Sequence, residues 1–227
     1  MGCHQKRHNA DMKFLYTSAL YLILLSAVSY SQKPCPGIPT VKYEAKIYHT
    51  VKIGSQCWLK ENLNVGVMVD SAQMQSNNDV IEKYCYHNDP ANCSKYGGLY
   101  QWYEALQYSS ETSNIKGICP KGWRIPDTTD FGKLSMAVNK NSKALKSFGQ
   151  GDASGIGNNN SGFSALLAGS RQLNGAFFGL NGYTYMWTIK VSNSVDAFDF
   201  YLNHGTAKIY QSDSRFEYGF SIRCIKD

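Results

Sequence analysis

The stretch GICPKGWRIPDTTDF, residues 117–131, brings together a Cys-Pro step, a Gly-Trp pair, an arginine and an Ile-Pro step directly before a predicted helix. In that helix Asp127 suits the N-cap, and Asp130 lies where a carboxylate favours the helix dipole. Pro126 fixes the backbone just ahead of the cap. A corner of this composition fits an active-site loop, a ligand-binding loop or a structural turn, and the rest of the chain decides between them.

Two helices are expected around this corner. Each is predicted from apolar residues that recur at helical spacing. The first set follows the Gly97-Gly98 pair and comprises Leu99, Trp102, Tyr103 and Leu106. The second follows Asp127 and comprises Phe131, Leu134 and Val138.

Strands are expected at both ends of the chain. Residues 41–58 alternate in polarity and predict two short strands joined around Glu44-Ala45-Lys46. The last third contains the tight-turn pairs Asn174-Gly175 and Asn181-Gly182, with alternating aromatic residues after the second. The predicted class is therefore α+β, with two helices packed on short twisted antiparallel sheets and long irregular loops.

The N-terminus predicts export. After Lys13 comes FLYTSALYLILLSAV, an apolar run shorter than the roughly 20 residues of a membrane span, followed by small residues that suit cleavage before Gln32. We expect residues 1–31 to be a signal peptide, with 1–11 a candidate mis-called extension because Met12 is the more ordinary start. Residues 32–40 are then a short lead and 41–227 one domain. No membrane insertion is expected once the signal is removed.

Charge and cysteine content narrow the class further. The chain carries 23 basic and 17 acidic side chains, a formal charge of +6 that is too small and too scattered to indicate nucleic acid. Six cysteines follow the predicted signal, and an even count in an exported chain indicates disulfides. Zinc is the competing use, but no C-x-x-C pair is present. Six cysteines allow about 15 connectivities, so the count alone leaves the pairing open.

Five motifs stand in a fixed order along the chain: TVKIGSQCWLKENLNVG, EKYCYHNDPANCSKYGGLYQWYEAL, GICPKGWRIPDTTDFGKL, SGFSALLAGSR and YGFSIRCIKD. This succession resembles the Fibrobacter succinogenes major paralogous domain, a family of secreted and surface proteins best represented in Fibrobacter and Bacteroidota. The resemblance runs from about Pro34 to Asp227. It departs at Asp130-Phe131, where the family favours Glu-Trp, and at Leu167-Ala168-Gly169, where the family favours a Pro-Gly-Gly type of segment.

The resemblance extends to the C-type lectin-like fold, in the branch shared with formylglycine-generating enzymes. It implies that the N- and C-terminal strands meet. It also implies three disulfides, which join Cys85 to Cys93, Cys119 to Cys224 and Cys35 to Cys57. The residues expected to hold the fold rather than a ligand are Trp123, Arg124, Pro126 and Arg223. The corner at residues 117–131 is accordingly interpreted as architecture.

Catalysis has little support in the sequence. Formylglycine-generating enzymes act through a pair of cysteines near the C-terminus, and here no cysteine lies between Cys119 and Cys224. His49, His87 and His204 are far apart, and no Ser-His-Asp motif with a nucleophile elbow is present. We therefore expect no enzyme and no catalytic residue, and the less favoured alternative is an enzyme related to that family.

A calcium site is the remaining cofactor hypothesis. The loop between Cys85 and Cys93 offers oxygen ligands, with Asp89 the candidate, although Asn, Asp and Pro are also turn formers. The sugar-binding signatures of calcium-dependent lectins are absent. No other cofactor is expected.

Binding is the function that the sequence favours. Flat aromatic rings stack on sugar rings, and the chain has 16 Tyr, 10 Phe and 4 Trp. Residues 149–162 form a long Gly- and Asn-rich loop, which is a candidate ligand-facing element. Candidate contacts in this loop and near the turns are Tyr108, Asn158, Asn159, Asn160, Phe178, Tyr183 and Tyr185, with simple packing as the alternative for each aromatic.

The sequence thus predicts an exported, non-enzymatic module that binds polysaccharide or glycoprotein, and that is secreted, periplasmic or displayed on the cell surface. The alternative is a structural or adhesin subunit that binds another protein. The sequence leaves the ligand and the oligomeric state open.

Overall fold

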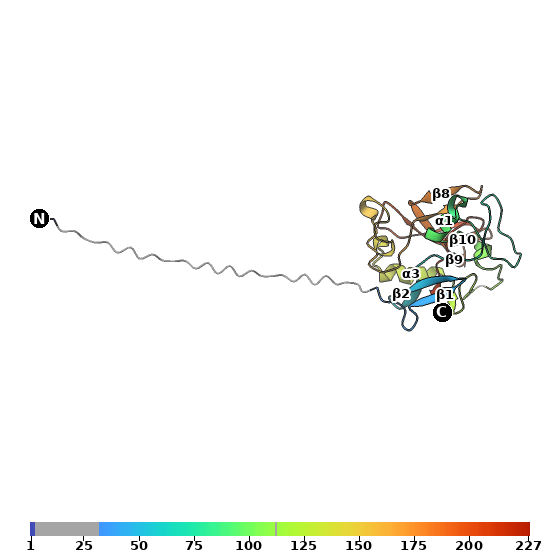
Figure 1. Cartoon of the computed structure of the whole chain (residues 1–227), viewed down its shortest axis with the longest axis horizontal. Coiled ribbons are helices and arrows are strands. Elements are labelled where there is room, and N and C mark those ends of the chain that lie inside the picture. Colours follow the sequence, from blue (N-terminus) through green and yellow to red (C-terminus); the bar gives the residue numbers. More distant parts are fainter. Residues whose placement is uncertain (3–31, 112) are drawn as a thin grey trace.

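A computed structural model describes residues 1–2, 32–111 and 113–227 (Figure 1). Apart from its first two positions, the predicted signal peptide lies outside the described residues. In the part that is described, no helix is both long and apolar enough to cross a membrane. The predicted lead at 32–40 is packed on the fold, since Lys52 N donates to Lys33 O at 2.8 Å and Cys35 N donates to Thr50 Oγ1 at 3.0 Å.

Two five-stranded sheets form the frame. The first, in the order β1-β2-β3-β12-β6, contains β1 (Thr40–Tyr43), β2 (Lys46–Ile53), β3 (Gln56–Leu59), β12 (Ile225–Lys226) and β6 (Trp123–Arg124). The second, in the order β11-β10-β9-β7-β8, contains β11 (Tyr210–Arg215), β10 (Asp196–Asn203), β9 (Tyr183–Val191), β7 (Ala168–Arg171) and β8 (Phe177–Leu180). A third pair joins β4 (Val67–Met68) to β5 (Glu82–Lys83).

The strands are mostly antiparallel, as predicted, but two pairings are parallel, β4 with β5 and β7 with β9. The parallel pairing of β7 with β9 rests on one register position, Gly169 opposite Thr184. In the sheet order β7 lies between β9 and the edge strand β8, so β8 pairs with one side of β7 and β9 pairs with the other. The predicted antiparallel pairing therefore holds for most strand pairs, and these two pairs are the exceptions.

The helices are short and differ from the prediction in number. They are α1 (Pro90–Tyr96), α2 (Trp102–Ala105), α3 (Thr128–Ala137) and α4 (Ser142–Leu145), with 3₁₀ turns η1 (Tyr86–Asn88) and η2 (Ala153–Gly155). The helix predicted after Asp127 is confirmed as α3. The one predicted over 99–106 shrinks to α2, because Leu99 and Tyr100 make strand-like bridges to Tyr84 and Phe220. A mixed α/β chain with few helices results.

Helix α1 was not predicted, because the Cys85 to Cys93 segment has the composition of a turn. Asp89 is its N-cap, and Asp89 Oδ1 accepts from Ala91 N at 2.9 Å. Pro90 occupies the first turn, where its missing N–H leaves no unpaired donor. The polar residues that indicated a loop are the ones that begin this helix.

The corner at 117–131 lies against the C-terminal strand. Register positions pair Trp123 with Lys226 and Arg124 with Ile225, and Ile225 also faces Trp58 of β3. Strands from the two ends of the described fold are therefore hydrogen-bonded neighbours, and the C-terminus lies beside β1 and β2 in Figure 1.

The start of α3 is fixed by polar contacts. Asp127 and Asp130 form a reciprocal capping box, with Asp130 N to Asp127 Oδ1 at 2.8 Å and Asp127 N to Asp130 Oδ2 at 2.9 Å. Arg124 donates to both oxygens of Asp130, at 2.6 and 3.2 Å. The Asp130 carboxylate thus caps the start of α3 and also binds Arg124 of the preceding strand β6.

Two large apolar clusters and a small one around Tyr84, Tyr86 and Leu99 make the core of the described residues, and all four tryptophans are buried in the large ones. The cluster beside the corner includes Trp102, Trp123, Trp187 and Phe220. The cluster beneath α3 includes Trp58, Phe131, Phe163 and Phe200. The three predicted disulfides, Cys35 to Cys57, Cys85 to Cys93 and Cys119 to Cys224, are all present.

Candidate functional site

The structure places the predicted ligand-contacting residues in three locations. Phe178, Tyr183 and Tyr185 come together on one face of the second sheet. Residues 158–160 lie beside the C-terminal end of α3 and α4, where Asn158 and Asn160 line a pocket. Tyr108 lies apart from both, just after α2.

The sheet face carries a continuous row of aromatic side chains, which we call the aromatic face. Its members are Phe178, Tyr183, Tyr185, Tyr201 and Tyr210. Successive ring centroids along this row are 5.7, 6.0, 5.4 and 4.7 Å apart. Each ring is therefore in van der Waals range of the next, and the row crosses the sheet from β8 to β11.

Strand register explains why these rings share one side. Tyr183 and Tyr185 are two residues apart on β9, so their side chains point to the same face. Tyr201 of β10 stands opposite Tyr185 and also opposite Tyr210 of β11. The intervening Thr184 and the paired Leu202 point the other way and are buried.

A polar edge borders the aromatic face at the end of β10. The His204 ring meets Tyr183 edge-on at 6.1 Å, and His204 Nδ1 lies 2.9 Å from Asp152 Oδ2. Asp152 belongs to the Gly- and Asn-rich loop, and its N–H donates to His204 O at 3.1 Å. The predicted loop therefore reaches the aromatic face through Asp152, and its asparagines at 158–160 lie elsewhere.

The rings are accessible to different degrees. Phe178 is 50% exposed, and the four tyrosines are half-buried. Burial, reinforced by the neighbouring Tyr183 and Asp199, raises the pKa of Tyr185 to about 12. Burial also raises the pKa of Tyr201, together with Tyr210. These phenols are consequently uncharged at neutral pH and can both donate and accept hydrogen bonds.

Beside the tyrosines, two residues before Tyr201 on β10 and opposite Trp187 of β9, lies a buried acid, Asp199. Its Oδ2 accepts from Ser214 Oγ at 2.9 Å, whereas Oδ1 has no partner among the described residues. Burial, opposed by the Ser214 bond and reinforced by Asp213, raises the pKa of Asp199 to about 7. This group has no access to solvent, so it belongs to the support of the aromatic face and not to its surface.

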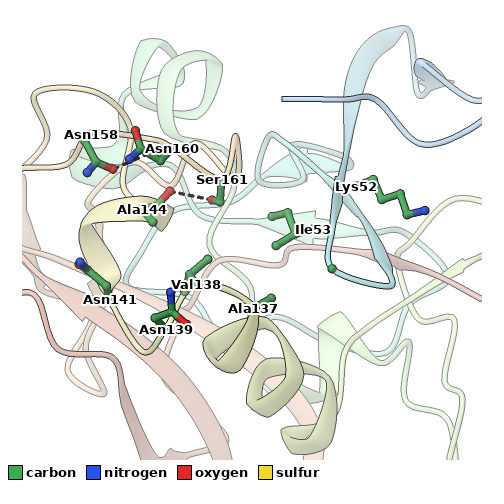
Figure 2. A pocket seen from close by; sticks show the side chains of 11 residues that line it. Lys52, Ile53, Ala137, Val138, Asn139, Asn141, Ala144, Asn158, Asn160 and Ser161 are labelled. Carbon is green, nitrogen blue, oxygen red and sulfur yellow. Dashed lines mark hydrogen bonds between the residues drawn. The ribbon is translucent and has the colours of Figure 1, made fainter. Parts of the chain in front are cut away.

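The pocket that Asn158 and Asn160 line has a volume of about 310 Å³ (Figure 2). Its apolar surface comes from Ile53, Ala137, Val138 and Ala144, and its carboxamides come from Asn139, Asn141, Asn158 and Asn160. Ser161 Oγ donates to Ala144 O at 2.7 Å, which holds the 158–161 segment onto α4. The Lys52 side chain extends away from the other labelled residues in Figure 2.

Apart from Lys52, the residues that line this pocket are uncharged. Two of its carboxamides complete local turns, since Asn141 Oδ1 accepts from Lys143 N and Asn158 Oδ1 accepts from Asn160 N. No carboxylate, histidine or cysteine lines it. It offers hydrogen bonds over a small apolar floor, which suits an uncharged polar ligand.

Two predicted residues have local partners instead of a shared site. Asn159 Oδ1 accepts from Ser164 N at 3.0 Å, so this side chain closes its own turn. Tyr108 stacks with Tyr103 at 6.4 Å, and burial together with Glu104 raises its pKa. Tyr108 therefore makes no part of the aromatic face.

Asp89 caps α1, as described above, and in the described ranges no group of three or more His, Cys, Asp or Glu side chains is arranged to hold a metal ion. The calcium hypothesis stays a prediction about this residue.

Tyr201, Tyr210, His204 and Asp152 were missed as site residues. Alternation in the segment 196–203 was the available signal, because a strand that alternates opposite Tyr185 must place some residue beside it. Which residue that is depends on register, and β10 shifts register between Ala197 and Asp199. Sequence alternation alone could not reveal that shift.

Residues 51–226 match the family model described as Fibrobacter succinogenes major domain. The matched range covers well over half of the chain and contains both the aromatic face and the pocket. No curated protein and no solved structure matches the chain.

Proposed function

The chain belongs to the Fibrobacter succinogenes major domain family, and from that premise we propose that it is an exported, non-enzymatic module that binds polysaccharide or the glycans of glycoproteins. The aromatic face is the proposed contact surface. The observation that carries the proposal is the row of five aromatic rings from Phe178 to Tyr210 on one sheet face.

The chemistry of this face suits sugars. A sugar ring has apolar C–H faces and a rim of hydroxyls, and a tyrosine offers an apolar ring with a hydrogen-bonding tip. A tyrosine hydroxyl is protonated at neutral pH, so Tyr185 can donate to a sugar oxygen, and its raised pKa extends this to alkaline pH. At the edge, the His204 and Asp152 pair adds polar groups beside Tyr183.

The shape of the face favours a chain over a small molecule. From β11 to β8 the sheet has four strand spacings, or roughly 19 Å at about 4.8 Å each. A surface of that extent accommodates several linked sugars, each with a modest contribution. The Asn-lined pocket, by contrast, is sized for a single small group.

We further propose that the fold is C-type lectin-like. The pairing of β12 with β3, which brings the two ends of the chain together, supports this assignment, as does the corner against β12. The three disulfides indicate an oxidising compartment. Together with the predicted signal peptide, they support a secreted, periplasmic or cell-surface location.

A structural or adhesin subunit with a protein partner is the second candidate. Phe148 favours it, because its side chain is 85% exposed and Ile156 of the adjoining loop is 47% exposed. The residues that follow them, Gly149 and Gly157, are joined by a hydrogen bond of 3.1 Å, and exposed apolar side chains that adjoin one another mark protein interaction sites.

A glycan array followed by calorimetry tests the proposal. We expect at least one polysaccharide or glycoprotein glycan to bind, with an affinity that EDTA leaves unchanged if Asp89 only caps α1. Loss of binding in EDTA would establish a calcium site. Absence of signal across the array, with and without calcium, would overturn the glycan proposal and favour the adhesin reading.

A further inference from the structure

A second hollow, which we call the basic pocket, lies between β2, the end of β3 and the C-terminal end of α1. Its volume is about 330 Å³, at the lower end of the range typical of ligand sites. Its lining includes Lys46, Lys60, Lys95 and Arg223, with Glu61 as its one carboxylate. Four cations therefore face one anion.

Glu61 offsets one of the four positive charges, and both of its oxygens already have hydrogen-bond partners. Its Oε2 accepts from His49 N at 2.8 Å, and its Oε1 lies 2.8 Å from His49 Nδ1. Both oxygens are thus held at the rim by a residue outside the pocket lining. The lysines lack a carboxylate within ion-pair distance among the described residues.

Arg223 forms a buried cationic wall of the basic pocket. It is 1% exposed, and its guanidinium lies 4.4 Å from the Phe163 ring centroid. Its four hydrogen bonds go to neutral acceptors, the Asn62 side chain twice and the main-chain oxygens of Leu59 and Phe163. A guanidinium has five N–H donors, so one donor is left over.

Burying a cation without a counterion carries a desolvation free energy that destabilises the fold, and an anion bound beside it offsets part of that free energy. Burial lowers the pKa of Arg223 to about 9, with Glu61 giving only partial compensation. Burial likewise lowers the pKa of Lys46 in the pocket lining, and Glu61 opposes this shift. The pocket lining therefore carries more positive charge than its one carboxylate offsets.

The basic pocket is connected to the aromatic face. Tyr96 lines the pocket and donates to Asn181 Oδ1 at 3.1 Å, and Asn181 stands two residues before Tyr183. A ligand that follows the sheet face beyond Tyr183 reaches the turn that borders the pocket. An anionic substituent on such a ligand would meet the lysines there.

We infer that the basic pocket binds the carboxylate of an acidic sugar, so that the glycans recognised at the aromatic face are uronate-containing polysaccharides. This inference rests on the proposed function and adds the substrate class. Lys46 and Lys60 would contact the carboxylate directly, while Arg223 supplies charge from behind.

Calorimetry with three matched oligosaccharides tests the inference: a galacturonic acid oligomer, a neutral galactose oligomer and a sulfated galactose oligomer. We expect the galacturonate oligomer to bind about tenfold more tightly than the neutral one in low salt, and the advantage to shrink in high salt. Lys46→Gln with Lys60→Gln should abolish that preference. Tighter binding of the sulfated oligomer would overturn the carboxylate assignment.

Matched controls keep the result interpretable. Lys121→Gln with Lys133→Gln removes the same charge from two exposed lysines outside the pocket and should keep the preference. If the Lys46 and Lys60 variant does not fold, Lys95→Gln alone, at an exposed position, should still weaken it. An unchanged preference in both pocket variants contradicts the inference.

Failure of the inference differs from failure of the proposed function. Equal affinities for the neutral and the acidic oligomer would contradict the acidic-sugar inference, while the proposal of glycan binding would stand. If no oligomer binds, free galacturonate can be tested by thermal unfolding. A rise in Tm that depends on Lys46 and Lys60 would retain the anion site and reject the glycan function.

Discussion

Arg124 and Asp130 join strand β6 in the corner at 117–131 to helix α3, and this pair explains why an arginine precedes the capping box. The two side chains are 16% and 8% exposed. Burial alone would raise the pKa of Asp130, but the Arg124 guanidinium and the Asp127 main chain outweigh it and hold the pKa below its usual value. The pair therefore stabilises the fold above the pKa of the unfolded carboxyl and is lost as pH falls through the folded pKa.

Arg124→Ala should lower the free energy of unfolding by about 3 kcal/mol, because it leaves a buried carboxylate without its cation. Urea unfolding at neutral pH measures this, and acid unfolding should begin at higher pH in the variant. Lys133→Ala, on the exposed side of α3, is the control and should change little. A variant of unchanged stability that lost only ligand affinity would contradict the structural role of Arg124.

Asp199 gives the opposite pH dependence. Its pKa is raised from 3.8 to about 7, so the folded state binds the proton more tightly than the unfolded state does. This group's contribution should therefore lower stability as pH rises from about 4 to about 7.

Asp199→Asn should remove that slope and raise the free energy of unfolding above pH 7 by up to about 4 kcal/mol. Unfolding curves across this pH range provide the measurement. Asp79→Asn, at an exposed position between β4 and β5, should keep the slope. Parallel pH profiles for wild type and Asp199→Asn would show that the acid is not buried as the structure has it.

At the scale of elements, the sequence predicted secondary structure correctly where the residues of one segment determine it by themselves. The capping residues Asp127 and Asp130 indicated α3, and the alternation of 41–58 indicated the first hairpin. Prediction failed where distant segments decided. Leu99 belongs to a helical pattern in the sequence, yet its pairing with Tyr84 gives it an extended backbone. The 85–93 segment has the composition of a turn, yet α1 begins within it.

The disulfides should differ in their effect on stability. Cys119 and Cys224 close a loop of 105 residues, whereas Cys85 and Cys93 close one of 8. In the chain-entropy account the longer loop contributes about 5 kcal/mol and the shorter about 2.5. Changing both cysteines to serine in each pair and measuring unfolding by urea should give the larger loss for Cys119 and Cys224. A larger loss for the short loop would contradict this ranking.

At the scale of the whole molecule, the aromatic face forms because the register of β9, β10 and β11 places its tyrosines side by side. Phe178, Tyr183 and Tyr185 were predicted as candidate contacts because they lie near tight turns, and the structure brings these three rings together. Tyr201 and Tyr210 join them only through cross-strand pairing, which no local pattern specifies. Tyr108 and Asn159 share the composition of the site residues and lie apart from the aromatic face, since each is held by neighbours in sequence.

The basic pocket was beyond prediction for a similar reason. Its lysines come from β2, the segment after β3 and α1, and Arg223 comes from the end of the chain. Arg223 was expected to hold the fold, and its hydrogen bonds to Leu59 and Asn62 do connect the two ends. Its placement against a hollow rich in lysine emerges only when these segments are packed together.

The claim that the aromatic face is the glycan surface is tested most directly by calorimetry on Phe178→Ala and Tyr201→Ala, using the best ligand from the array. Both variants should remain folded by thermal unfolding and bind at least about tenfold more weakly, because each removes one ring from the row. Tyr103→Ala, which removes a 47% exposed ring of α2, away from the aromatic face, should bind like wild type. Wild-type affinity in both face variants would contradict the account.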